Sequence, residues 1–144
     1  MPRVRLEPLE KYPFSVVIEV RTTDVNYRGH LGNDRLLTLV HEARVAFLKK
    51  HGFTEKDCGG VALIMADTAV LYQGEAFAGD FLRFEAAAGE PTRCGLRFFY
   101  RVTNQATGRA IALVENGMVC YDYENKQPVP LPAAKLLKKF DQNF

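Results

Sequence analysis

The sequence has 144 residues, of which 47% are apolar and 25% are charged. These values are typical of one globular domain with a core of its own, and they exclude a disordered chain. The formal net charge of +2 gives no electrostatic reason to expect a nucleic-acid partner. No apolar run approaches the roughly 18 residues of a membrane span, and no apolar block follows the N-terminal charges as in a signal peptide. We therefore expect one soluble cytoplasmic domain over residues 1–144, with no nucleic-acid partner and no membrane span.

Cysteine usage agrees with a reducing compartment. Cys58, Cys94 and Cys120 are odd in number and form no C-x-x-C pair, so neither a disulfide framework nor a zinc site is expected. Cys94 and Cys120 lie in apolar runs that favour buried, unreactive thiols. The three histidines share no ligand spacing with a carboxylate, so we predict neither a metal site nor a cofactor.

The N-terminal half predicts an arm, a strand, a loop and a helix. The first dozen residues form the arm, and residues 14–22 are rich in β-branched side chains typical of a strand. Residues 24–32 hold two glycines among polar residues and indicate a loop. Apolar residues then recur at helical spacing over residues 34–50. Asn33 or Asp34 can serve as its N-cap, and Gly52 fits the position just past its end.

The residue pattern of the C-terminal half predicts a β-sheet. Short separators with turn chemistry predict antiparallel pairing of four strands. These strands cover residues 61–72, 81–89, 95–104 and 110–123. Prolines end the sheet, and residues 133–140 predict a short basic amphipathic helix. With one long helix, the economical α+β architecture is a curved antiparallel sheet wrapped around it. The uncovered face or edge of such a sheet predicts pairing with another subunit.

The loop and the helix that follows carry a family resemblance. Residues 24–33 read D-V-N-Y-R-G-H-L-G-N, and Glu42-Ala43-Arg44 follows within the helix. These segments resemble the D-x-D-x-x-G-H-V-N-N loop and the helical E-x-A-R of hotdog-fold acyl-CoA thioesterases, in the 4-hydroxybenzoyl-CoA thioesterase-like branch. Weaker echoes occur in the same order at Tyr72, Gly79-Asp80, 107–109 and 129–132.

The resemblance implies a hotdog fold, a homodimer or homotetramer, and cleavage of an acyl-CoA or acyl carrier thioester in a pocket between subunits. Such hydrolysis needs an activated water or a carboxylate nucleophile, together with donors for the carbonyl oxyanion. In the family, backbone N–H groups at the helix N-terminus point toward that oxygen. Here this terminus lies near Gly32 and Asn33, and both residues are candidate substrate-binding positions. The missing Cβ of Gly32 lets a ligand approach the backbone closely.

One departure from the family pattern concerns the catalytic carboxylate. The family places it four residues before the histidine, and that position here is Asn26. An amide can orient water or donate a hydrogen bond, but it is no general base. Asp24 is the first replacement candidate, because residues two apart share a face of an extended segment; bracing of the loop is its alternative role. His30 is predicted either to act in acid–base chemistry or to hold the loop onto the sheet.

Two further carboxylates are candidates for substrate binding. Glu42 shares a helical stripe with Arg35 and Thr38 that could face a ligand or a partner, and its alternative is a buried salt bridge. Asp67 interrupts an apolar strand and is the second replacement base, with an ordinary paired charge as its alternative. The basic C-terminal helix could contact phosphates or form a solvated face.

The leading hypothesis is therefore an acyl-CoA thioesterase with Asp24, Asn26 and His30 as catalytic residues. The alternative is a non-hydrolytic hotdog protein that binds an acyl thioester, and it is motivated by Asn26. A structural dimer with no ligand is the third and weakest hypothesis.

Overall fold

The computed structural model describes residues 3–140. A β-strand, a short 3₁₀ helix and a long α-helix come first, and a run of strands and a short helix follow. The elements are β1 (Phe14–Glu19), η1 (Thr22–Asp24), α1 (Asn33–Lys50), β2 (Ala62–Tyr72), β3 (Phe81–Gly89), β4 (Gly95–Asn104), β5 (Ala110–Asp122), β6 (Gln127–Pro128) and α2 (Ala133–Phe140).

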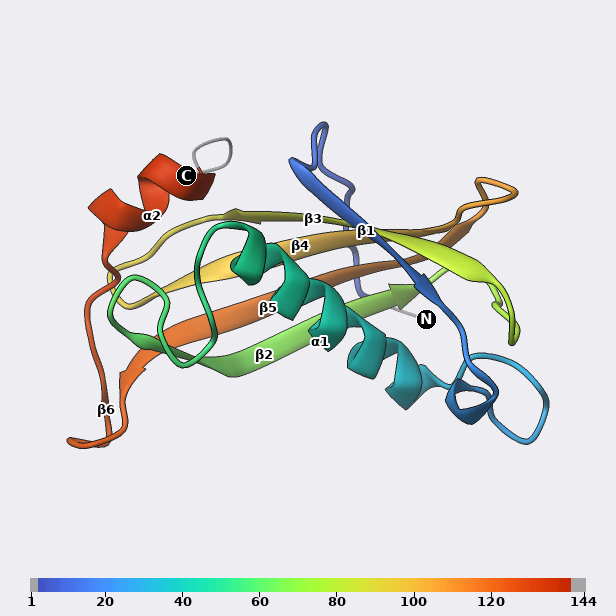
Figure 1. The fold of residues 1–144 in the computed structure, drawn as a ribbon, viewed down its shortest axis with the longest axis horizontal. Coiled ribbons are helices and arrows are strands. Elements are labelled where there is room, and N and C mark those ends of the chain that lie inside the picture. Colours follow the sequence, from blue (N-terminus) through green and yellow to red (C-terminus); the bar gives the residue numbers. More distant parts are fainter. Residues whose placement is uncertain (1–2, 141–144) are drawn as a thin grey trace.

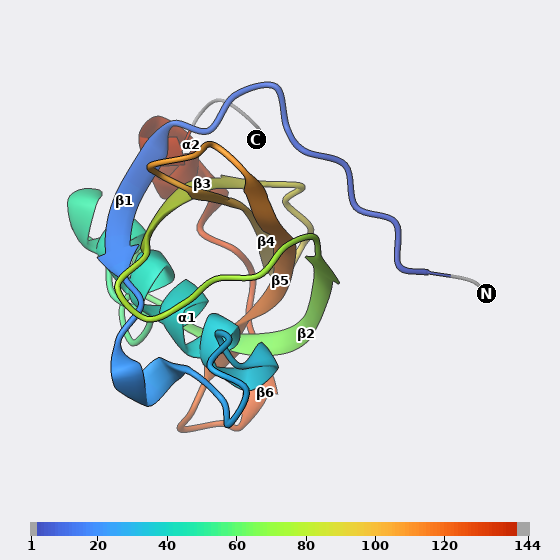
Figure 2. The same cartoon turned by 90° about the vertical axis from the view of Figure 1, so that its right-hand side faces the viewer.

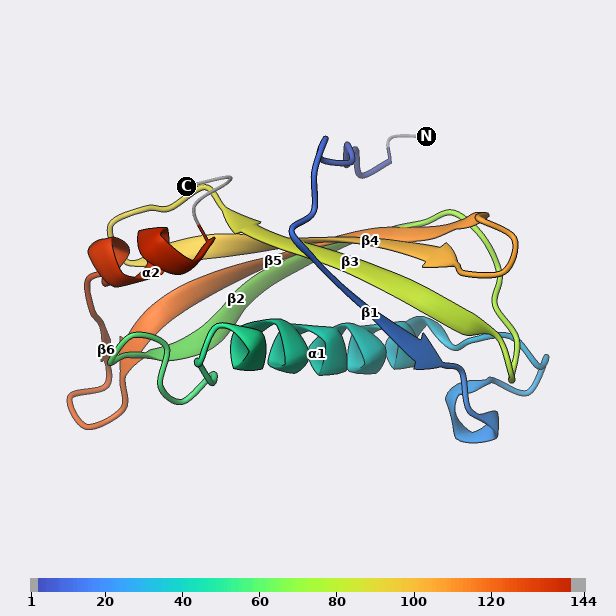
Figure 3. The same ribbon diagram turned by 45° about the horizontal axis from the view of Figure 1, so that its top comes forward.

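The strands form one antiparallel sheet in the order β1-β3-β4-β5-β2, and β6 pairs with β5. Figure 1 shows α1 lying along one face of this sheet, and Figure 3 shows the same helix as a rod beneath the strands. Viewed along the helix, the sheet curls around α1 (Figure 2). The predicted α+β architecture, a curved antiparallel sheet around one long helix, is confirmed.

The core lies between the inner face of the sheet and the apolar stripe of α1. In β4 the side chains alternate, so that Phe98, Tyr100 and Val102 are buried in the core while Arg97 and Arg101 lie on the outer face. The helix buries its residues at helical spacing. Its buried residues are Leu36, Leu39, Val40, Ala43, Arg44, Phe47 and Leu48.

The ends of two predicted elements differ from expectation. The strand predicted over residues 14–22 stops at Glu19, because the chain turns into η1 and Asp24 binds back to Arg21. The predicted N-cap at Asn33 or Asp34 is wrong, since Gly32 is the N-cap and Asn33 is the first helical residue. The helix end is as predicted: Gly52 follows it with a φ of 80° that favours glycine.

The three cysteines are free thiols. Burial raises the pKa of the Cys58 thiol to about 12 and that of Cys120 to about 11. Two of the three are therefore held as neutral thiols at physiological pH and are poor nucleophiles.

The N-terminal arm runs along the outer side of the sheet (Figure 2). The Tyr12 ring lies 4.8 Å from the Arg101 guanidinium, which in turn is bound by Glu85. None of the helices in the described part of the chain is long and apolar enough to cross a membrane.

Candidate functional site

A cavity of about 320 Å³ opens at the N-terminal end of α1. Four segments line it: the loop before α1, the first turn of α1, the end of β2 with the connection that follows, and the start of β5. The lining residues are Asn26, His30, Leu31, Gly32, Asn33, Leu36, Tyr72, Gly74, Glu75, Ala76 and Ile111. The structure thus brings Asn26, His30, Gly32 and Asn33 together, as the resemblance implied.

The loop before α1 is closed by Asn26. Its backbone N–H donates to the His30 carbonyl at 2.7 Å, and its side-chain Oδ1 accepts from the N–H groups of Arg28 (3.0 Å) and His30 (3.2 Å). Gly29 permits the turn with a φ of 82°. The Asn26 amide oxygen is therefore engaged in holding the loop, and only its NH₂ group remains to meet a ligand.

Asp24 lies behind this loop and is fully buried. Its Oδ2 accepts from the Arg21 backbone N–H at 2.9 Å and from Arg21 Nε at 3.1 Å, and its Oδ1 accepts from Arg21 Nη2 at 3.1 Å. The Arg21 hydrogen bonds hold the pKa of Asp24 below its usual value. The Asp24 backbone carbonyl accepts from Gly32 N–H at 3.0 Å. These contacts describe a carboxylate that braces the loop, the alternative role considered for it.

The first turn of α1 borders the cavity directly. Gly32 has no side chain with which to cap the helix, so the first-turn N–H groups lack the capping acceptor that a serine or aspartate would supply there. The Gly32 N–H itself is engaged with Asp24, so the donors available to an anion begin at Asn33. The Tyr72 hydroxyl donates to the Asn33 carbonyl at 3.0 Å and ties the end of β2 to this turn.

His30, on the loop before α1, also lines the cavity and is half-buried. Its ring packs edge-on against Phe77, with ring centroids 5.2 Å apart, and its Nδ1 lies 3.5 Å from Oε1 of Glu75. The position of Glu75 could not be predicted from the sequence, because the segment from Gln73 to Asp80 shows only turn chemistry and carries no periodic signal. Its sole sequence signal is a carboxylate directly after a glycine, which is common in loops.

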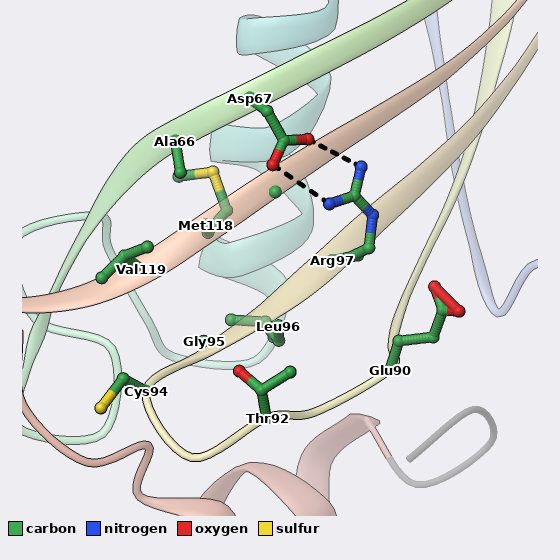
Figure 4. A pocket seen from close by; sticks show the side chains of 11 residues that line it. Ala66, Asp67, Glu90, Thr92, Cys94, Gly95, Leu96, Arg97, Met118 and Val119 are labelled. Atoms are coloured by element: carbon green, nitrogen blue, oxygen red, sulfur yellow. Dashed lines mark hydrogen bonds and ion pairs between the residues drawn. The ribbon is translucent and has the colours of Figure 1, made fainter. Parts of the chain in front are cut away.

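Neither Glu42 nor Asp67 lines this cavity in a single copy of the chain. Glu42 is exposed on α1, so the buried salt bridge considered as its alternative role is not formed within one chain. Asp67 lies on the outer face of the sheet, where Arg97 Nη2 donates to its Oδ1 at 2.8 Å (Figure 4). Arg97 also donates to Glu115, at 3.2 Å, and its hydrogen bonds lower the pKa of Asp67. Asp67 thus has the paired role considered as its alternative, beside a separate cavity of about 410 Å³.

The buried charged residue of α1 is Arg44, two positions after the exposed Glu42 and on another face of the helix. Arg44 is 5% exposed; its Nε donates to Glu55 Oε1 at 2.6 Å and its Nη1 donates to Asn116 Oδ1 at 2.9 Å. The Asn116 amide in turn donates to Thr68 Oγ1 at 3.2 Å. This network adjoins a second inner cavity of about 310 Å³ between α1 and β2.

The basic helix α2 packs at the opposite end of α1 (Figure 1). Its Phe140 ring contacts Phe47, with centroids 5.3 Å apart. Within one chain its lysines therefore lie far along the helix from the cavity at Gly32.

Comparison with known proteins places this geometry in a family. The model of the thioesterase-like superfamily matches residues 20–140. The chain belongs to this superfamily, and its fold is the hotdog fold that the loop resemblance implied. Comparison with curated proteins finds no match.

Several solved structures share this fold. A 1,4-dihydroxy-2-naphthoyl-CoA thioesterase from Synechocystis superposes with a TM-score of 0.80 at 17% identity, over 90% of this chain and 96% of that one. A thioesterase from Thermus thermophilus, solved with coenzyme A and zinc, gives 0.76 at 23% identity over 90% and 98%. A probable thioesterase from Escherichia coli gives 0.74 at 19% identity over 88% and 98%.

Proposed function

We propose that the chain hydrolyses the thioester of an acyl-CoA or an acyl carrier in the cavity beside α1. The observation that carries the proposal is the juxtaposition of the His30 imidazole with the uncapped N-terminus of α1 on one cavity of about 320 Å³. Membership of the thioesterase-like superfamily supports the reaction class. One structural neighbour is named as a 1,4-dihydroxy-2-naphthoyl-CoA thioesterase and another was solved with coenzyme A, which supports a CoA thioester as substrate class.

Each wall of the cavity has a task in this reaction. The thioester oxygen faces the first turn of α1, where N–H groups from Asn33 onward and the helix dipole stabilise developing negative charge. His30 takes a proton from the attacking water. The Asn26 NH₂ group orients substrate or water, and Asp24 supports the reaction by bracing the loop that carries both side chains.

We further propose that two or four copies assemble and that the site lies beside the subunit interface. The outer edge of β2 is the end of the sheet, and this strand is 11 residues long. A long open edge is a template for pairing with another strand. Exposed apolar side chains lie on β2 and on α1: Met65 is 45% exposed, Val45 43% and Leu37 38%. A second copy would cover these groups together with the inner cavity that Leu37 and Met65 line.

Hydrolysis of a panel of aliphatic and aromatic acyl-CoAs by the purified chain tests the proposal. The reaction is monitored by the loss of thioester absorbance, so that protein thiols do not interfere. We expect turnover with at least one member and a loss of about 10²–10⁴-fold in kcat for His30→Gln, the usual contribution of a general base. Absence of turnover across the panel, with the assembled protein, would refute hydrolysis. Sedimentation of Met65→Asp, expected to give smaller species than the parent, tests the interface.

Acyl thioester binding without hydrolysis is the second candidate. Position 26 supplies an amide in place of a carboxylate, and the oxygen of this amide is already engaged in closing the loop. Both observations favour binding without hydrolysis. It predicts that the parent binds acyl-CoA in calorimetry without turnover and that Asn26→Asp gains hydrolysis. Activity of the parent with no gain for Asn26→Asp favours the first candidate.

A further inference from the structure

Glu75 is the one carboxylate among the described residues that line the cavity beside α1. Asn26 is an amide, and the Asp24 carboxylate is buried behind the loop with both oxygens bound by Arg21. Thioester hydrolysis in this cavity therefore lacks a carboxylate at the two loop positions considered first. The position that holds one lies on the facing segment, after β2.

This facing segment is fixed in place rather than free to move as a loose loop. The N–H groups of Gln73 and Gly74 both donate to the Ile111 carbonyl, at 2.9 and 3.2 Å. Gly74 packs so tightly that a Cβ there would collide with the Ala110 carbonyl oxygen. Two residues beyond Gly74, the Ala76 carbonyl accepts from Leu31 N–H at 2.8 Å. The backbone on either side of Glu75 is thus held between β5 and the His30 loop, while the Glu75 side chain itself is 64% exposed.

The imidazole of His30 is restrained on two sides. A backbone bridge pairs His30 with Phe77, whose ring packs edge-on against the imidazole. The Nδ1 atom lies 3.5 Å from Glu75 Oε1. Such contacts are commonly long in the unliganded state and shorten when substrate is bound. Because Nδ1 is the ring nitrogen beside the carboxylate, Nε2 is the ring atom left to meet a water.

We propose that Glu75 is the positioning residue of a Glu75–His30 pair, holding the His30 tautomer with its proton on Nδ1 so that Nε2 acts as base. The inference rests on the hydrolysis proposed above and names the carboxylate that this reaction uses. A carboxylate beside one ring nitrogen of a histidine fixes the tautomer of the imidazole and stabilises the imidazolium that forms when the other nitrogen takes up a proton.

The step balances without a further reactant. The water oxygen bonds to the thioester carbonyl carbon while one water proton passes to Nε2, and Glu75 stabilises the resulting imidazolium. The tetrahedral oxyanion, held at the first turn of α1, then collapses and the carbon–sulfur bond breaks. The leaving thiolate takes the proton from Nε2, which yields a carboxylic acid, a thiol and neutral His30.

A double-mutant cycle on the full chain tests the pairing. For Glu75→Ala we expect kcat to fall roughly 10- to 100-fold, with KM within about threefold of the parent, since the lost interaction acts in the transition state. Glu75→Gln, which keeps an acceptor oxygen, should recover part of this loss. In a His30→Gln background, Glu75→Ala should change kcat by less than about twofold, because residues that act as a unit are not additive. Glu124→Ala is the matched control: this exposed glutamate lies in the turn after β5, and its kcat should equal that of the parent.

A second readout needs no turnover. ¹⁵N NMR of the neutral imidazole of His30 reports which ring nitrogen carries the proton; we expect the Nδ1–H form in the parent and a shift toward Nε2–H in Glu75→Ala. Full activity of Glu75→Ala, an equal loss of kcat in the His30→Gln background, or unchanged tautomer populations would overturn the pairing. A parent without turnover would refute the proposed hydrolysis instead, and the tautomer populations would then decide the pairing alone.

Discussion

Replacement of Arg44 by methionine is expected to destabilise the fold strongly. The guanidinium is 5% exposed and donates to Glu55 at 2.6 Å and to Asn116 at 2.9 Å. The Arg44→Met change leaves the buried Asn116 oxygen without its donor, at a cost of about 1–3 kcal/mol, and removes a charge-assisted bond worth about 1.5–3 kcal/mol. Glu55 retains some exposure and contact with His41, so its charge can be partly rehydrated. We therefore expect a total near 3 kcal/mol.

Urea unfolding measures this loss. With a slope of about 2 kcal/mol per molar for a domain of this size, a loss near 3 kcal/mol lowers the midpoint by about 1.5 M. Arg35→Met is the control, since Arg35 is exposed on the same helix and such changes stay within about 0.5 kcal/mol. Arg44→Lys should fall between the two, because one ammonium cannot reproduce the guanidinium fork. A loss below about 1 kcal/mol for Arg44→Met would refute the view that this network stabilises the chain.

Two further predictions concern titration and thiol chemistry. Asp24→Asn should lower the urea midpoint at pH 7, where the parent carboxylate is ionised and bound by Arg21. The folded pKa of Asp24 lies below its ordinary value, so the stability that the ionised carboxylate gives to the fold is lost as pH falls through that depressed pKa. The urea midpoints of variant and parent should therefore converge in acid. A difference that is constant with pH would contradict this reasoning. Under native conditions near pH 8, iodoacetamide should label Cys94 first, as followed by mass spectrometry. The reason is that burial raises the pKa of Cys58 to about 12 and that of Cys120 to about 11. Labelling of Cys58 at the same rate as Cys94 would contradict this prediction.

Local signals in the sequence were sufficient to locate most elements. The bounds predicted for β3 and β4 agree with the structure, because each strand alternates in polarity and ends in turn chemistry. The long helix differs from prediction by one residue at its start. The loop from Asp24 to Gly32 also lies against the helix N-terminus as expected. Each of these features depends on neighbours in sequence, where periodicity and turn preference act directly.

The role of Asp67 could not be predicted in the same way. Strict alternation along β2 would place Asp67 on the same face as Leu63 and Met65, toward the helix. A β-bulge between Met65 and Asp67 reverses the alternation, so that Asp67 pairs with Gly117 on the outer face and binds Arg97. No residue in this run signals the bulge, because neither glycine nor proline occurs at it.

The same bulge explains the buried network behind it. Once the alternation is reversed, Thr68 turns inward opposite Asn116 and accepts its amide proton. Asn116 is then oriented with its oxygen toward Arg44. Arg44 and Asn116 lie 72 positions apart in the sequence, so their contact depends on the register of β2 with β5 and on the seating of α1. Such contacts are properties of the folded chain and have no local signature.

Glu75 was missed for a related reason, and its position bears on the chemistry of the site. A carboxylate that replaces Asn26 can be predicted only on the loop and on the strands, because there the spacing gives a direction to each side chain. The connection after β2 gives no such direction. The course of this connection is set by contacts with residues remote in sequence. Gly74 packs against the Ala110 carbonyl, and the Ala76 carbonyl accepts from Leu31 N–H. An amide at position 26 is therefore compatible with hydrolysis, because the fold brings a carboxylate to the same cavity from the opposite wall.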